Sequence, residues 1–167
     1  RTGECHRGRL PEPVVTDLVI VSLEEWDDVW RRNQHLVAGL LRSDPSLRVL
    51  FVEPSPDPVH ALLSGRRPQR GARLRPRAVP GVDDRRLWLY QATKVLPRRI
   101  DSDVDRRWAT KIERAAITVG LQSPLLWIND PTGACLLERT GWPALYDLTD
   151  DWLASRRSRR ETPRVVP

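Results

Sequence analysis

The stretch "VVTDLVIVSL" (residues 14–23) decides the fold that we expect for this chain. β-Branched and other apolar residues fill it almost without interruption, which is typical of a strand buried on both faces. Such strands belong to parallel sheets covered by helices on each side. A second run of this kind, "LRVLFVEP" (residues 47–54), ends at Pro54. The two runs predict neighbouring strands of one parallel sheet.

Between these runs the apolar residues follow the spacing of an amphipathic helix, which we expect over residues 27–42. The predicted buried face consists of Val29, Trp30, Asn33, Leu36, Val37, Leu40 and Leu41. Four acids stand at the expected N-terminus of this helix, where the helix dipole favours negative charge: Glu24, Glu25, Asp27 and Asp28. A strand–helix–strand unit with a right-handed crossover is thus predicted within the first third of the chain.

Further elements alternate in the same way. We expect a short helix within residues 58–65 and two short strands around a turn at residues 80–84. A long helix from Asp101 or Ser102 to about Gly120 should follow, then a strand at residues 124–130, a short helix ended by Gly141, and a buried strand at residues 144–146. This alternation predicts an α/β fold, with a mainly parallel sheet in a three-layer domain.

The 167 residues are enough for one domain with a real core. No segment approaches the roughly 20 apolar residues of a membrane span, and the N-terminus lacks the apolar core of a secretory signal. We therefore expect a cytoplasmic protein. Cys5 and Cys135 lie far apart and match no metal-binding spacing, which favours two reduced thiols.

The net charge of +6 allows a polyanionic partner. Much of the excess lies at residues 66–77 and 156–164, where Pro or Gly interrupts the arginines and no aromatic residue is available for base stacking. Three interpretations stay open: solvated segments, peripheral contact with an anionic membrane at its inner face, and nucleic-acid binding. Specific nucleic-acid binding is the least favoured of the three.

Polar residues follow the predicted strands at the edge where ligands bind in open α/β sheets. The candidate cleft residues are Trp26, Asp27, Asn129, Asp130, Asp150 and Asp151. Carboxylates and amides can bind hydroxyl groups, and a Trp ring offers a flat surface for a sugar. The alternative is helix capping, most directly for Asp130 before "PTGACLL" and for Asp150 and Asp151 before the basic tail.

Familiar catalytic and nucleotide-binding motifs are absent from the sequence. No Gly-rich turn follows the first strand, which argues against a nucleotide pyrophosphate at the first helix. Nothing supports a metal site, because the acids have no distinctive ligand spacing. For His35, two turns into the predicted helix, packing or partial exposure is favoured over a role as a catalytic base.

Four segments together resemble the N-terminal half of bacterial glycosyltransferases with the two-domain GT-B fold, of the kind grouped with family 4. They are "EEWDDVWRRNQHLVAGLLR", "LRVLFVEP", "LLWINDPTG" and "GWPALYDLTDDW". The resemblance implies a Rossmann-like domain at residues 14–154 that binds the acceptor, preceded by a disordered segment at 1–13 and followed by a basic tail at 155–167. It also implies a hexosyltransferase-type reaction on a sugar or lipid-linked acceptor of the cell envelope.

In such enzymes a nucleotide-sugar donor lies mostly on a C-terminal domain, which this sequence does not contain. The resemblance therefore implies a truncated chain without a cofactor of its own, inactive alone, with a separate donor domain as a further expected partner. No residue is assigned as the catalytic base.

Two other classes of function stay open. A flavodoxin-like or receiver-like binding module could use Glu24, Glu25 and Asp130 as its acids, although Lys111 falls inside the predicted long helix, where a receiver would not have it. A basic nucleic-acid-binding domain is the third.

Overall fold

The computed structural model describes residues 17–56, 61–62, 64–65, 67, 71–93 and 101–148. The segments expected at 1–13 and 155–167, the candidates Asp150 and Asp151, and half of the helix expected at 58–65 lie outside these residues.

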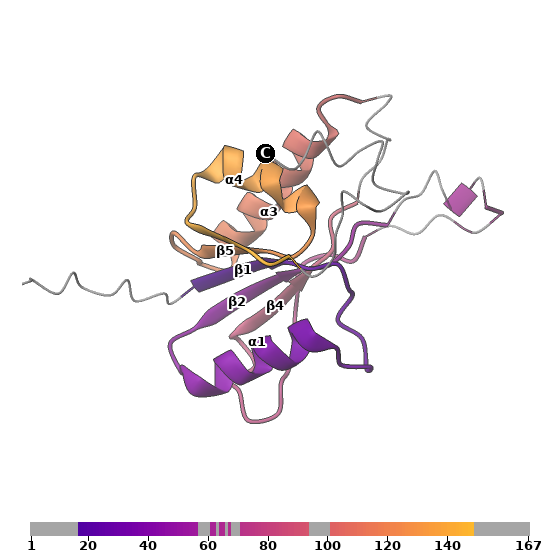
Figure 1. Cartoon of the computed structure of the whole chain (residues 1–167). Coiled ribbons are helices and arrows are strands. Elements are labelled where there is room, and N and C mark those ends of the chain that lie inside the picture. Colours follow the sequence, from indigo (N-terminus) through magenta and orange to yellow (C-terminus); the bar gives the residue numbers. More distant parts are fainter. Residues whose placement is uncertain are drawn as a thin grey trace, which may run out of the picture.

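A six-stranded sheet with the order β3-β4-β2-β1-β5-β6 forms the centre of the molecule (Figure 1). Its strands are β1 (Asp17–Val21), β2 (Arg48–Val52), β3 (Arg75–Pro76), β4 (Leu87–Tyr90), β5 (Leu125–Ile128) and β6 (Ala144–Tyr146). All neighbours pair in parallel except β3, which runs antiparallel to β4. The apolar runs that predicted buried strands form β1 and β2, whose side chains are almost all buried.

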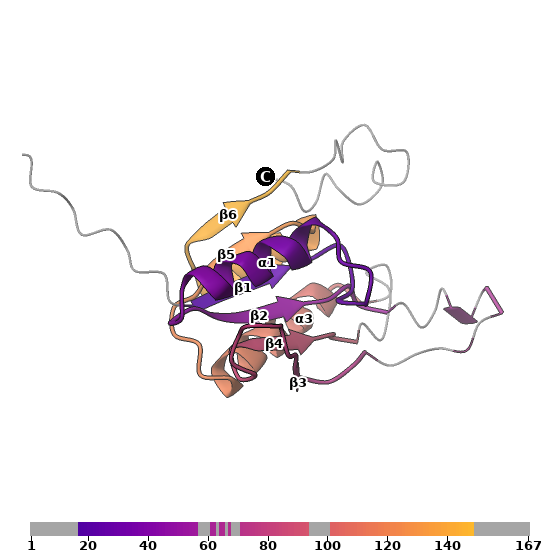
Figure 2. The same cartoon turned by 90° about the horizontal axis from the view of Figure 1, so that it is seen from below.

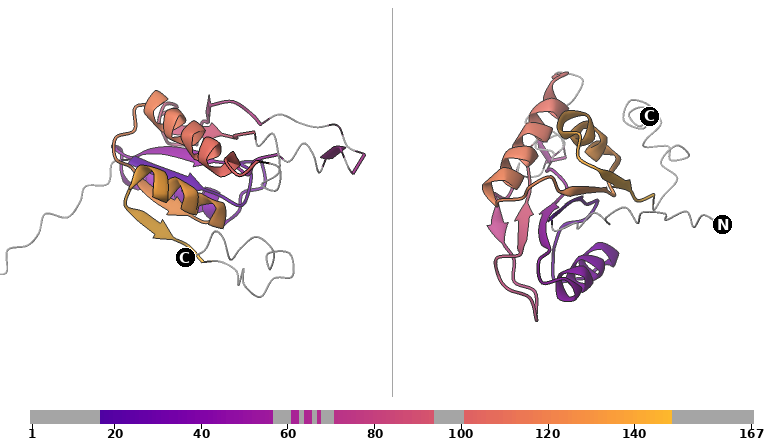
Figure 3. Two further views of the ribbon diagram at one scale, coloured as in Figure 1. Left: turned by 90° about the horizontal axis from the view of Figure 1, so that it is seen from above. Right: turned by 90° about the vertical axis from the view of Figure 1, so that its left-hand side faces the viewer.

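Helices cover both faces of this sheet. Helix α1 (Arg32–Ser43) lies below it in Figure 1, and α3 (Val104–Thr118) and α4 (Ala134–Thr140) lie above it. The end-on view in Figure 3 shows the same three layers. One buried apolar cluster joins α3 and α4 to the sheet, and another joins α1 to the opposite face. The predicted α/β, Rossmann-like three-layer fold with a mainly parallel sheet is confirmed.

The strand order distinguishes between two kinds of doubly wound sheet. Strand β1 lies between β2 and β5, and β4 lies outside β2. This is the Rossmann arrangement, whereas a flavodoxin-like sheet places its third parallel strand beside the first. The topology therefore disfavours the flavodoxin-like and receiver-like alternative. It also locates the switch point, where ligands bind in such sheets, at the carboxyl ends of β1 and β5.

Helix α1 begins five residues later than predicted, because the side chain of Gln34 fixes its first turn. Gln34 Oε1 accepts a hydrogen bond from the backbone N–H of Arg31, and Gln34 Nε2 donates to the carbonyl of Glu25. The four acids expected at the helix dipole therefore lie in the preceding loop, and the first turn contains none. The buried face also differs from the prediction, since Leu36 and Leu40 are exposed.

Helix α3 also begins later than predicted, at Val104. Asp103 precedes it, and Asp101 Oδ1 accepts a hydrogen bond from the backbone N–H of Asp103. The buried face of this helix includes five residues at helical spacing: Val104, Trp108, Ile112, Ala115 and Ala116.

Strand β6 is exposed, so the prediction of a buried last strand was wrong. Within the described residues β6 is an edge strand that pairs only with β5, and Figure 2 shows it at the margin of the sheet beyond α1. The apolar residues of "ALY" are typical of a buried strand, but they do not indicate how many strands pair with β6.

Among the described residues, none of the helices combines the length and the apolar character that crossing a membrane requires.

Candidate functional site at the carboxyl edge of the sheet

Three buried neutral side chains meet at the switch point. Asn33, in the first turn of α1, donates from Nδ2 to Ser22 Oγ at 3.2 Å and to Asn129 Oδ1 at 2.9 Å. Ser22 follows β1 and Asn129 follows β5, so this network joins the two central strands to α1. Each of the three side chains is at most 3% exposed. We call this set the amide cluster: Ser22, Asn33 and Asn129.

The amide cluster retains unused hydrogen-bonding capacity. Both Nδ2 hydrogens of Asn33 are used, but its Oδ1 accepts nothing from the residues that the structure describes. Ser22 Oγ accepts from Asn33 and from the backbone N–H of Glu24, which leaves its O–H to donate. Asn129 Nδ2 donates to the carbonyl of Asp147 at 3.4 Å and keeps a second hydrogen. One acceptor and two donors thus have no partner among the described residues.

Asp147, directly after β6, forms hydrogen bonds that link α1 to the strands at this edge of the sheet. Its Oδ2 accepts from Arg32 Nη1 at 2.5 Å and from Trp127 Nε1 at 3.1 Å. The hydrogen bond from Arg32 lowers the pKa of Asp147 below its ordinary value; burial acts in the opposite direction, and the bond from Trp127 again lowers the pKa. The carboxylate is therefore ionised at neutral pH and connects α1, β5 and β6.

Asp130 and Tyr146 lie on the other side of the β5–β6 edge. Asp130 Oδ1 accepts from the backbone N–H of Thr132 at 2.8 Å, so the capping role weighed for this residue is confirmed. The capped element is the short 3₁₀ helix Pro131–Gly133 that precedes α4. Tyr146 is partly exposed, and burial, followed by the charge of Asp130, raises the pKa of its phenol. The phenol therefore stays protonated at neutral pH.

A second polar group lies at the end of β2. Glu53, 3% exposed, accepts from Arg75 Nη2 with both carboxylate oxygens and from the backbone N–H of Trp26. This contact draws Trp26 into the core, where its ring packs edge-to-face against Phe51 and Trp30. Trp26 is only 5% exposed, so its ring has no free face for a sugar, in contrast to the expectation from the sequence.

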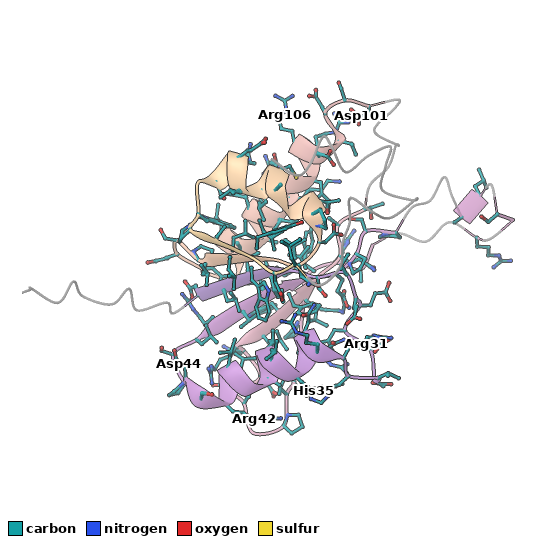
Figure 4. All side chains as sticks on the ribbon, in the orientation of Figure 1. Arg31, His35, Arg42, Asp44, Asp101 and Arg106 are labelled. Carbon is teal, nitrogen blue, oxygen red and sulfur yellow. The ribbon has the colours of Figure 1, made fainter. Side chains whose placement is uncertain are left out.

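The remaining candidates from the sequence are separated along this edge. Asp27 is exposed and pairs with Arg31, which lies at the start of α1 in Figure 4. Asn129 belongs to the amide cluster, with Asp130 next to it. The structure therefore brings Asn129 and Asp130 to the switch point, whereas Trp26 belongs to the Glu53 group. His35 projects from α1 away from the sheet and packs against Trp30, as the favoured interpretation held.

The start of α1 is not arranged as a phosphate site. Residues 22–31 form a long connection before the helix, in place of the short Gly-rich turn that cradles a pyrophosphate. The two arginines at this place are already paired, Arg31 with Asp27 and Arg32 with Asp147. Among the residues that the structure describes, no group of three or more His, Cys, Asp or Glu side chains could hold a metal ion.

Sequence reasoning did not select Ser22, Asn33 or Asp147 for the site. A signal for Asn33 was present, because it is an amide at a position of the helix that otherwise carries apolar residues. Asp147 carried a similar signal, since it directly follows the last predicted strand.

The fold and these contacts define a Rossmann-like α/β domain with a neutral polar cluster at its switch point. Comparisons of the chain with protein-family models, with curated proteins and with solved structures gave no match.

Proposed function

We propose that this chain is the acceptor-binding domain of a glycosyltransferase, and that a sugar or lipid-linked saccharide binds at the carboxyl ends of β1 and β5. The observation that supports this most directly is the unused capacity of the amide cluster. A sugar hydroxyl both donates and accepts hydrogen bonds, so it can satisfy Asn33 Oδ1 together with the donors of Ser22 and Asn129.

The same cluster disfavours a phosphate group as the ligand at this position. A phosphate oxygen accepts hydrogen bonds and carries negative charge, so it would oppose Asn33 Oδ1 and the ionised Asp147. The local arginines are paired with acids, as described above, and are not free to compensate. A neutral polyol suits the site better, and this agrees with a domain that binds the acceptor while the nucleotide-sugar donor binds elsewhere.

Transfer to a cell-envelope acceptor remains part of this proposal, with the donor held by a separate domain. On this proposal the described chain contributes hydrogen bonds that position the acceptor hydroxyl. No residue of the amide cluster is a base, since amides and a serine without a histidine partner do not accept a proton at neutral pH.

A saccharide-binding experiment tests the proposal. The ¹⁵N-labelled protein is titrated with methyl glycosides of glucose, galactose, mannose and N-acetylglucosamine and with short oligosaccharides of these sugars. The indole N–H of Trp127 is the reporter, because it donates to Asp147 beside the cluster. We expect saturable shifts with at least one sugar, and a loss of affinity of at least about tenfold in Asn129→Ala, the equivalent of one good hydrogen-bonding contact.

The matched control is Gln122→Ala, an exposed residue before β5 at the opposite edge of the sheet. It should bind as the wild type does. Absence of binding by every sugar, or equal affinity in Asn129→Ala and in the wild type, would refute the proposed function.

A further inference from the structure

Tyr146 projects toward the α4 face of the sheet. In the register of β5 and β6, Tyr146 lies opposite Ile128 and Leu145 lies opposite Trp127. Ile128 belongs to the apolar cluster between the sheet and helices α3 and α4. Trp127 belongs to the apolar cluster between the sheet and α1. Since successive residues of a strand point to opposite faces, Tyr146 and Leu145 project to different sides of the same edge.

The ring of Tyr146 is also accessible, unlike the rings of Trp26 and Trp127. Tyr146 is 37% exposed, whereas Trp26 and Trp127 are at most 7% exposed. Sequence reasoning assigned a flat stacking surface to Trp26, and the structure places that residue in the core. Tyr146 supplies such a surface at the end of β6.

Asp130 supplies a hydrogen-bond acceptor beside this ring. Its Oδ1 is used by Thr132, while its Oδ2 accepts no hydrogen bond from the described part of the chain. Asp130 comes two residues after Ile128, the residue opposite Tyr146 in the register, and its charge adds to the effect of burial in raising the pKa of the phenol. An accessible ring and a carboxylate oxygen with spare capacity thus lie together on one side of the switch point, and the amide cluster lies on the other.

We propose that Tyr146 and Asp130 form a subsite for one sugar ring, which rests its apolar face on the Tyr146 ring and donates a hydroxyl hydrogen to Asp130 Oδ2. Sugar rings carry C–H groups on one face that pack on aromatic rings, while their hydroxyl groups need acceptors at the margin. This inference rests on the proposed function, and it names the part of the ligand that binds here: a pyranose ring, positioned by Tyr146 next to the amide cluster.

The test uses the glycoside titration with the intact chain and four variants. Tyr146→Ala removes the ring, Tyr146→Leu keeps apolar bulk without a flat face, and Tyr146→Phe keeps the face without the hydroxyl. The matched control is Leu145→Ala, which truncates an exposed residue of the same strand on the opposite side. Thermal unfolding of each variant shows whether the domain remains folded, and the indole N–H signal of Trp127, which donates to Asp147 directly after β6, shows whether β6 remains in place.

We expect Kd to rise at least about tenfold in Tyr146→Ala and Tyr146→Leu, and by less than about threefold in Tyr146→Phe and Leu145→Ala. Saturation-transfer NMR should show contact between the ring protons of the sugar and the protein in the wild type and in Tyr146→Phe. Affinity in Tyr146→Leu equal to that of the wild type overturns the subsite, and the proposed function stands if Asn129→Ala still loses binding. Absence of binding to the wild type overturns both.

Discussion

Asn33 Nδ2 lies 2.9 Å from Asn129 Oδ1, although 96 residues separate the two in the sequence. This hydrogen bond connects the first turn of α1 to the end of β5. It fixes the distance between the helix and the strand at the point where a ligand of this fold would bind.

The first prediction concerns the energetic coupling of this pair. Asn33→Ala or Asn129→Ala alone leaves a buried amide without its partner, which should lower the free energy of unfolding by about 1–3 kcal/mol. The double variant should lose less than the sum of the two single losses, because the second truncation removes the group left unpaired. Urea unfolding gives the free energy of unfolding of the wild type, the two single variants and the double variant. Strict additivity would show that the two side chains act independently.

Asp147 leads to a prediction about pH. Because its pKa is lower in the folded chain than in the unfolded chain, its contribution to stability is complete above the ordinary aspartate range and disappears as pH falls through the lower folded value. Wild type should therefore exceed Asp147→Asn in stability at pH 7, with a gap that narrows in acid. The midpoints of urea unfolding of the two proteins at several pH values measure this difference in stability. A gap independent of pH would contradict the assigned role of the charge.

At the opposite edge of the sheet, a buried carboxylate pairs with a partly exposed arginine. Asp17 is 2% exposed and accepts from Arg48 Nε and Nη2 at 2.8 and 2.9 Å. Arg48→Met leaves this carboxylate buried without its cation, which should cost about 3 kcal/mol. Arg139→Met removes an exposed partner of Glu113 and should cost less than about 1 kcal/mol. Similar losses in both variants would argue against the importance of burial at Asp17.

Gly71 is required by close backbone packing. A Cβ atom at this residue would lie 2.3 Å from the carbonyl oxygen of Gln91, so Gly71→Ala must displace the chain. We expect a loss of about 1–3 kcal/mol in the free energy of unfolding. Gly39, in α1, has no atom within 4 Å of such a Cβ, and Gly39→Ala should raise stability by about 0.5–1 kcal/mol. The midpoint temperature of thermal unfolding should therefore fall in Gly71→Ala and rise in Gly39→Ala.

Binding to anionic membranes remains a prediction for residues 66–77. Within the described part of this segment, Arg75 pairs with Glu53 and Arg77 with Asp28, which leaves fewer arginines to face a lipid surface. Each available Arg adds up to about 1 kcal/mol near such a surface. Co-sedimentation should increase with the anionic lipid fraction of vesicles and decrease with salt. Sedimentation that does not depend on lipid charge would contradict the membrane proposal.

The sequence predicted the sheet and its layers because the responsible forces are local and periodic. The apolar runs of β1 and β2 and the helical spacing of α3 need no knowledge of distant residues. The start of α1 does not follow from this spacing, because it depends on the side-chain hydrogen bonds of Gln34 to Arg31 and to the Glu25 carbonyl nine residues earlier.

The site was only partly predictable for the same reason. Asn129 and Asp130 follow a strand that is visible in the sequence, and both lie at the switch point. Trp26 is drawn into the core by a hydrogen bond to Glu53, 27 residues away, and no local pattern reports this contact. Tyr146 was expected in a buried strand because Ala144 and Leu145 before it are apolar, and this pattern does not show how many strands pair with β6.

Strand β6 has a consequence for exchange with solvent deuterium. Within the described part of the chain its backbone joins the sheet through β5 alone, including the hydrogen bond from the Asp147 N–H to the Ile128 carbonyl. Local detachment of this strand needs far less free energy than global unfolding, so its amide protons should be among the first of the sheet to exchange. A ligand that binds Tyr146 requires β6 to stay paired with β5. Bound sugar should therefore slow the exchange of the β6 amide protons and leave the exchange rate of the β1 amide protons unchanged.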